Sequence, residues 1–132
     1  MAAIDTNVLV RLLMQDDKAQ LARAQRLVSA SLAAEQDLFV PISVALELEW
    51  VLRSRFGLDK DAVLHLFSQL LLTVELRFEA AAAIEWTLRQ YREASTDFSD
   101  CLHAALASRA GEQPLWTFDK AAAKVGGARL LT

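Results

Sequence analysis

The sequence of 132 residues contains little cysteine and histidine, and these shortages exclude two kinds of site. Cys101 is the only cysteine, which excludes an intrachain disulfide and a cysteine-rich zinc site. The two histidines, His65 and His103, lie far apart in the chain and form no metal-binding cluster. Because no nucleophile–base arrangement surrounds these three residues, we interpret them as core or surface side chains.

An excess of positive charge is also absent. The formal net charge is −3 and the pI is about 5.3, which argues against a module that binds nucleic acid through charge alone. An enzyme that holds phosphates through metal ions is still compatible with this charge. No apolar run approaches the roughly 18 residues of a membrane span, and no basic segment precedes an apolar run as in a signal peptide. We therefore expect a cytoplasmic protein without a membrane partner.

Hydrophobic residues are abundant, at 54% of the chain. This length and composition predict one domain over residues 1–132 with its own core, and part of the apolar surplus is expected at an interface with another chain. Apolar segments predict strands at residues 1–4, 37–42, 73–78, 113–118 and 128–131. Periodic segments predict helices from Val8 onward and at residues 17–36, 43–57, 59–72, 79–95, 97–111 and 119–127. The alternation predicts an α/β fold: a three-layer α/β/α sandwich around a mostly parallel sheet of four or five strands.

Four acidic residues are expected at one edge of this sheet, where ligands bind beyond the carboxyl ends of the strands. Asp5 and Asp119 each follow a predicted strand, and Glu47 lies in the first turns of the helix after the second strand. Asp100 begins a helix that leads to a later strand, but two helices fill that crossover, so its place at the same edge is plausible without being required.

Each acid also has a structural explanation. Thr6 or Asn7 caps a helix near Asp5 in one reading, Asp97 and Asp100 form a capping pair, and Asp119 caps the next segment. Glu49 points nearly opposite to Glu47, which borders the apolar stripe that contains Leu48. We therefore interpret Glu49 as a solvated or partner-facing charge. A carboxylate at the end of a buried strand is costly unless it is paired, however. If the four acids converge, they need a counter-charge, and Mg²⁺ or Mn²⁺ suits oxygen ligands.

Four segments resemble, in order, the motifs of the PIN domain: IDTNVLV, ALELEWVLRSRFG, DFSDCLHAALA and LWTFDKAAAK. The similarity is greatest to the VapC-like ribonuclease toxins of toxin–antitoxin pairs. It implies that Asp5, Glu47, Asp100 and Asp119 are the catalytic and metal-binding acids. It also implies a metal-dependent endoribonuclease, normally a homodimer, that an antitoxin protein inhibits. Supporting residues that hold carboxylates or contact phosphate would be Thr6, Asn7, Asp97 and Thr117.

Arginines are the candidate RNA contacts of this acidic protein, because their planar forks match phosphate. The candidates, each of which is alternatively a solvated residue, are Arg11, Arg53, Arg55, Arg89 and Arg92. Leu46 and Trp50 form a second apolar strip on the helix of Glu47, which predicts a dimer or antitoxin contact. For Trp50 the alternative is packing in the core, and the same alternative applies to Trp86 and Tyr91 on another helix. Two other functions stay open: a non-catalytic PIN-type binding module, and a metal-dependent phosphohydrolase of small phosphate esters.

Overall fold

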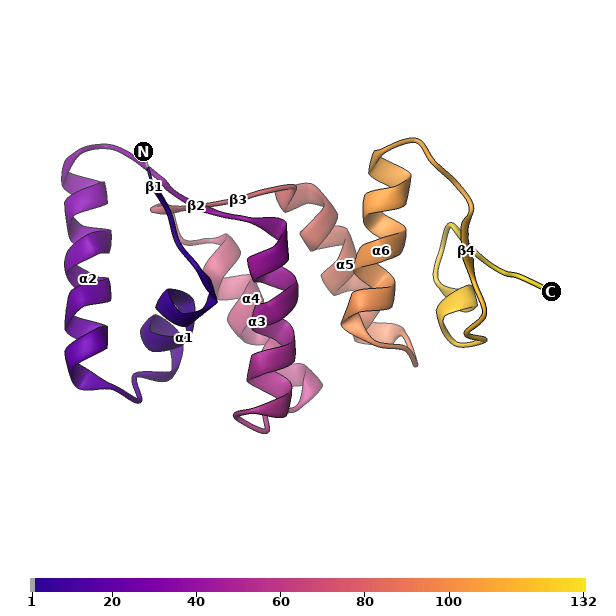
Figure 1. The fold of residues 1–132 in the computed structure, drawn as a ribbon, viewed down its shortest axis with the longest axis horizontal. Coiled ribbons are helices and arrows are strands. Elements are labelled where there is room, and N and C mark those ends of the chain that lie inside the picture. The colour runs from indigo at the N-terminus through magenta and orange to yellow at the C-terminus, as the bar shows by residue number, and fades with distance from the viewer. Residues whose placement is uncertain (1) are drawn as a thin grey trace. The chain divides into compact units, whose positions relative to one another are not determined.

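The computed structural model describes residues 2–132 and divides into two compact units, which are described separately (Figure 1). Unit 1 is Met1–Glu79 and unit 2 is Ala80–Thr132. The first position of the strand predicted at residues 1–4 lies outside the described residues. None of the helices in residues 2–132 combines the length and apolar character needed to cross a bilayer.

Unit 1 is a three-stranded parallel sheet with four helices. Its strands pair in the order β1-β2-β3, with Ala3 opposite Phe39 and Val40 opposite Phe78. Helix α1 packs against α2 and α3, whereas α4 packs against α3 and β3 (Figure 1). In chain order the elements are β1 (Ala2–Ala3), α1 (Thr6–Met14), α2 (Lys18–Ala33), β2 (Leu38–Val40), α3 (Ile42–Ser54), α4 (Lys60–Leu71) and β3 (Leu76–Phe78).

Local sequence signals explain where the helices of unit 1 begin. The carboxylates of Asp17 and Asp59 accept hydrogen bonds from the third amide beyond them, at 3.0 and 2.9 Å, and so cap α2 and α4. Gly57, with φ of 66°, adopts the left-handed conformation in the turn after α3. The prediction that the first helix begins at Val8 is wrong, since α1 begins at Thr6.

Unit 2 pairs two helices with a small parallel sheet. It contains α5 (Ala81–Glu93), α6 (Phe98–Arg109), β4 (Leu115–Thr117), the 3₁₀ helix η1 (Ala122–Lys124) and β5 (Ala128–Leu130). Helices α5 and α6 pack together, and the rings of Tyr91 and Phe98 meet edge to face between them, with centroids 5.6 Å apart. Strand β4 pairs in parallel with β5, with Trp116 opposite Arg129.

The structure confirms the α/β class and the order of helices and strands predicted from the sequence. Every described strand pair is parallel, as the alternation of strands and helices predicted. The five strands lie in two sheets, one of three strands and one of two. The predicted sheet of four or five strands is thus described as two smaller parallel sheets, with β1, β2 and β3 in unit 1 and β4 and β5 in unit 2.

Candidate functional site: carboxylates after parallel strands

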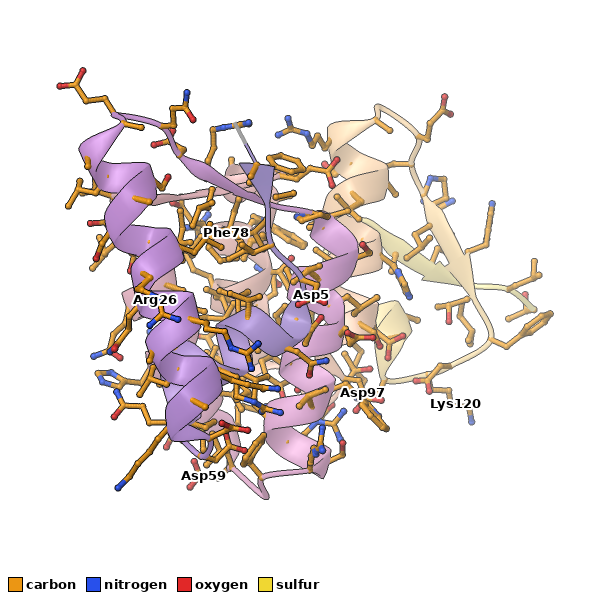
Figure 2. The ribbon with its side chains drawn as sticks, turned by 60° about the vertical axis from the view of Figure 1, so that its left-hand side comes forward. Asp5, Arg26, Asp59, Phe78, Asp97 and Lys120 are labelled. Atoms are coloured by element: carbon orange, nitrogen blue, oxygen red, sulfur yellow. The ribbon has the colours of Figure 1, made fainter. Side chains whose placement is uncertain are left out.

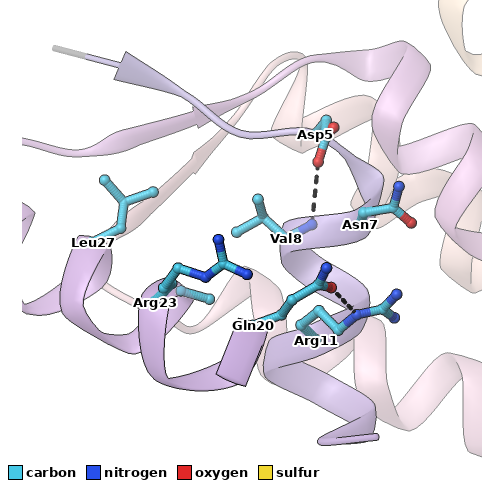
Figure 3. Close-up of a pocket in the computed structure, with 8 residues that line it drawn as sticks. Asp5, Asn7, Val8, Arg11, Gln20, Arg23 and Leu27 are labelled. Atoms are coloured by element: carbon cyan, nitrogen blue, oxygen red, sulfur yellow. Dashed lines mark hydrogen bonds between the residues drawn. The ribbon is translucent and has the colours of Figure 1, made fainter. Parts of the chain in front are cut away.

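Asp5 lies between a strand and a helix and belongs to the ends of both. Ile4 donates its amide to the carbonyl of Phe39 at 3.0 Å, which extends the pairing of β1 with β2 up to Asp5. The Oδ1 atom of Asp5 then accepts the amide of Val8 at 3.1 Å and caps α1 (Figure 3). Asp5 is thus the N-cap, and the alternative reading in which Thr6 or Asn7 caps the helix is wrong. Capping uses one carboxylate oxygen, and the residue is exposed.

Glu47 lies on a helix that leaves the same edge of the sheet. Strands β1 and β2 are parallel neighbours, so Asp5 and the start of α3 both follow strand ends at this edge. Glu47 is the sixth residue of α3, about 8 Å along the helix from Ile42 at about 1.5 Å per residue. Helix α1, which Asp5 caps, packs against α3. Glu47 is exposed, as a ligand-binding carboxylate must be.

Glu49 corrects a prediction made for the same helix. Its side chain is not solvated, because the residue is only 2% exposed. Its Oε2 atom accepts a hydrogen bond from the Nε atom of Arg53, at 2.9 Å, and the two charges form an ion pair across one helical turn. The i, i+4 spacing of a glutamate before an arginine was visible in the sequence and is the signal that sequence reasoning missed.

In unit 2, Asp100 lies in the first turn of α6 and is half-buried. Its Oδ2 atom accepts a hydrogen bond from the hydroxyl of Thr96, which orients the carboxylate. The predicted capping pair is not formed: Asp97 occupies the N-cap position, but its side chain makes no capping hydrogen bond. The carboxylate of Asp100 is therefore held by the hydroxyl of Thr96, and the contact with Asp97 is limited to a backbone hydrogen bond from the amide of Asp100 to the carbonyl of Asp97.

Asp119 follows β4 and is held in the same way as Asp5. Its Oδ1 atom accepts the amide of Ala122 at 2.9 Å, so the predicted cap of the next segment is confirmed. The amide of Asp119 donates to the Oγ1 atom of Thr117 at 3.1 Å. Thr117 thus orients the backbone of Asp119, and the role predicted for it as a supporting residue stays a prediction.

Asp100 and Asp119 lie toward the same end of unit 2. Helix α6 packs against β4, and a short connection of residues 110–114 joins them so that they run in opposite directions (Figure 1). The start of α6 is consequently at the end where β4 finishes. Asp97, the residue before α6, and Lys120, the residue after Asp119, mark this end in Figure 2.

A cavity of about 380 Å³ opens beside Asp5 in unit 1. Side chains of α1 and α2 line it, and Figure 3 shows them beneath the carboxylate of Asp5. The lining residues are Asp5, Asn7, Val8, Arg11, Gln20, Arg23, Ala24 and Leu27. Sequence reasoning did not find Gln20 and Arg23. Their signal was the spacing of Gln20, Arg23, Ala24 and Leu27, which places polar and apolar side chains on one face of a helix.

The chemistry of the four acids suits a hard divalent cation. Asp5, Asp100 and Asp119 each use one carboxylate oxygen in a hydrogen bond, and within residues 2–132 the second oxygen makes none. Mg²⁺ and Mn²⁺ prefer such oxygen donors. Among residues 2–132, no group of three or more His, Cys, Asp or Glu side chains is placed to hold a metal ion.

The remaining predicted residues divide by exposure. Arg11 is half-buried and pairs with Asp16 at 3.3 Å, whereas Arg55, Arg89 and Arg92 are exposed. Leu46 is half-buried and Trp50 is 59% exposed, so the alternative that Trp50 packs in the core is wrong. On α5, Trp86 is half-buried and Tyr91 is a core residue. His65 and His103 are exposed and Cys101 is buried, in agreement with their interpretation as surface and core residues. Thr6 is buried and Asn7 exposed.

Parallel strands followed by exposed carboxylates define an α/β protein of the kind that binds its ligand at the carboxyl edge of a sheet. The sequence model of the PIN domain matches residues 2–128, and the chain belongs to the PIN domain family. PIN domains are generally nucleases and typically use divalent metal ions. A search of curated proteins finds no match to this chain.

Proposed function

We propose that the protein is a metal-dependent endoribonuclease and the toxin of a toxin–antitoxin pair. The observation that carries the proposal is the placement of Asp5 and Asp119 directly after parallel strands, in a chain that belongs to a nuclease family. Both carboxylates are oriented by backbone amides and keep an oxygen for a ligand. Oriented carboxylates beyond strand ends are suited to hold a divalent cation, which in turn neutralises charge on a phosphodiester.

In this proposal Asp5, Asp100 and Asp119 hold Mg²⁺ or Mn²⁺, with Glu47 as a further ligand or as the group that orients water. A bound divalent ion supplies Lewis acidity that activates water and stabilises charge on the phosphate. The amide of Val8 orients Asp5, and the hydroxyl of Thr96 orients Asp100. Glu47, in its role as base, accepts a proton from the attacking water.

Hydrolysis follows the family pattern, with water attacking phosphorus and the bond to the 3′ oxygen breaking. The water oxygen stays on the 5′-phosphate, and the departing 3′ oxygen takes up a proton to become a hydroxyl. Arg55, Arg89 and Arg92 are the proposed phosphate contacts, since Arg11 and Arg53 already pair with carboxylates.

The test of the function is cleavage of single-stranded RNA by the purified full chain with Mg²⁺, with Mn²⁺ and with a chelator. We expect products with 5′-phosphate and 3′-hydroxyl ends, formed only when a divalent ion is present. A chromogenic small phosphate ester serves as the comparison substrate. Hydrolysis of the ester with intact RNA would identify a phosphohydrolase, and binding of RNA without any hydrolysis would identify a binding module.

We also propose that α3 provides a homodimer or antitoxin contact through Trp50 and Leu46. Trp50 exposes more than half of its surface. Tryptophan is among the side chains most enriched in protein interfaces, so this exposed indole favours a contact with another chain. We expect the protein to sediment as a dimer at micromolar concentration and Trp50→Ser to shift it toward the monomer. Trp116→Ser, which changes another half-exposed tryptophan, is the control. A wild-type protein that sediments as a monomer would eliminate the dimer.

A further inference from the structure

The cavity between α1 and α2 has the size and the lining of a site for one nucleotide. Its volume of about 380 Å³ lies within the range of about 300–1,000 Å³ that small-molecule sites occupy. Val8, Ala24 and Leu27 supply an apolar wall, and the remaining lining residues carry amides or charges. An apolar surface beside polar groups is the arrangement that accepts the face of a nucleobase and its polar edge.

Arg23 supplies a cation that no protein carboxylate neutralises. Its side chain is exposed and makes no hydrogen bond or ion pair with residues 2–132, whereas the neighbouring Arg11 is paired with Asp16. Figure 3 shows the guanidinium of Arg23 directed into the space between α1 and α2, on the side of the cavity away from Arg11. A guanidinium in this setting is suited to a bidentate contact with phosphate.

Gln20 lies between the two arginines and has a defined orientation. Its Oε1 atom accepts a hydrogen bond from the Nε atom of Arg11. Because arginine can only donate, the oxygen of the Gln20 amide must face Arg11, and the NH₂ group of Gln20 is left to donate elsewhere. The cavity therefore presents a directed donor, which fits a carbonyl oxygen or ring nitrogen on the edge of a nucleobase.

We propose that this cavity binds one unpaired nucleotide of the RNA substrate, next to the phosphodiester hydrolysed at Asp5. Arg23 contacts a phosphate, Gln20 donates to the base edge, and Leu27 with Val8 covers the base face. The nucleotide is unpaired because a base stacked within a duplex cannot enter a cavity between two helices. The inference rests on the proposed ribonuclease function and adds the residues of α1 and α2 that hold one nucleotide of the substrate.

The test compares Arg23→Gln with Arg26→Gln, a substitution of the same charge on the same helix. Arg26 is exposed but does not line the cavity (Figure 2). Binding of a short fluorescent single-stranded RNA is measured by anisotropy with a chelator present, so that nothing is cleaved. We expect Arg23→Gln to raise Kd about tenfold and to reduce the slope of log Kd against log salt by about 0.7, the loss of one phosphate contact. Arg26→Gln should change both quantities little, and melting curves confirm that both variants fold.

Titration of ¹⁵N-labelled wild-type protein with each ribonucleoside 5′-monophosphate locates the site. Amide shifts at Val8, Gln20, Ala24 and Leu27 support the proposal; shifts confined to other residues, or equal effects of the two arginine variants, overturn it.

Cleavage assays separate the proposed nucleotide site from the proposed ribonuclease function. If wild-type protein cleaves RNA and Arg23→Gln has an unchanged KM, the nucleotide site is refuted and the ribonuclease function stands. If RNA binds through the cavity but is never cleaved, the ribonuclease function fails while the binding site stands.

Discussion

Replacing Asp5 with asparagine is expected to lower the rate of metal-dependent RNA cleavage about 1,000-fold. Loss of a group that merely supports a metal ligand typically costs 10–100-fold, so loss of a direct ligand should cost more. The fold should survive, because asparagine and aspartate are about equally good N-caps and the amide of Val8 keeps its acceptor. The measurements are initial rates with Mn²⁺ and the melting temperature without metal.

Asp59→Asn is the matched control for this prediction. Asp59 caps α4 through a hydrogen bond from Ala62 at 2.9 Å, and it lies outside the candidate site (Figure 2). Both variants should melt like the wild type without metal. Metal should raise the melting temperature of the wild type and of Asp59→Asn, since an ion that binds only the folded state stabilises it. The rise should be largely absent in Asp5→Asn. Normal cleavage by Asp5→Asn would exclude Asp5 as a metal ligand.

Phe98→Ala is expected to reduce the free energy of unfolding by about 4 kcal/mol, through loss of apolar burial and creation of a cavity. Phe98 is 0% exposed at the start of α6, and its ring packs edge to face against Tyr91 of α5. For a chain of this length, the loss corresponds to a decrease of about 10–20 °C in melting temperature. The measurement is urea unfolding followed by circular dichroism.

Phe118→Ala is the control, because it removes the same phenyl ring from an exposed position. Phe118 is 80% exposed, so its removal should change the free energy of unfolding by about 0.5 kcal/mol or less. If the two variants were equally stable, Phe98 would not be a core residue of unit 2. The comparison also concerns the site, because Phe98 fixes the first turn of the helix that carries Asp100.

Much of the local structure was predictable from the sequence, because it depends on neighbours in the chain. The strands before Asp5 and Asp119 and the helices after them follow from short apolar runs and periodic segments. The cap at Asp119 was also predictable, since an acid three residues before a free amide is a local arrangement. The capping residue of α1 could not be chosen from the sequence, because Asp5, Thr6 and Asn7 are successive polar residues that can all fill that role.

The errors arose where two faces of a helix compete for burial. Helix α3 has apolar residues on two sides, and the sequence does not say which side its neighbours cover. In the structure, α3 packs against α1 and α4, Leu48 and Glu49 are buried, and Trp50 is exposed. The helix thus buries a charged side chain and exposes an indole. The ion pair with Arg53 makes burial of the Glu49 carboxylate tolerable.

The sequence by itself determined the class of fold, the order of its elements and the acids that follow strands, since these depend on short-range periodicity and on residue chemistry. Only the tertiary structure decided that β4 pairs with β5, that Glu49 is buried, and that α1 and α2 enclose a cavity beside Asp5. Strand partners and cavities depend on contacts between residues far apart in the chain, and no local pattern encodes which of those contacts form.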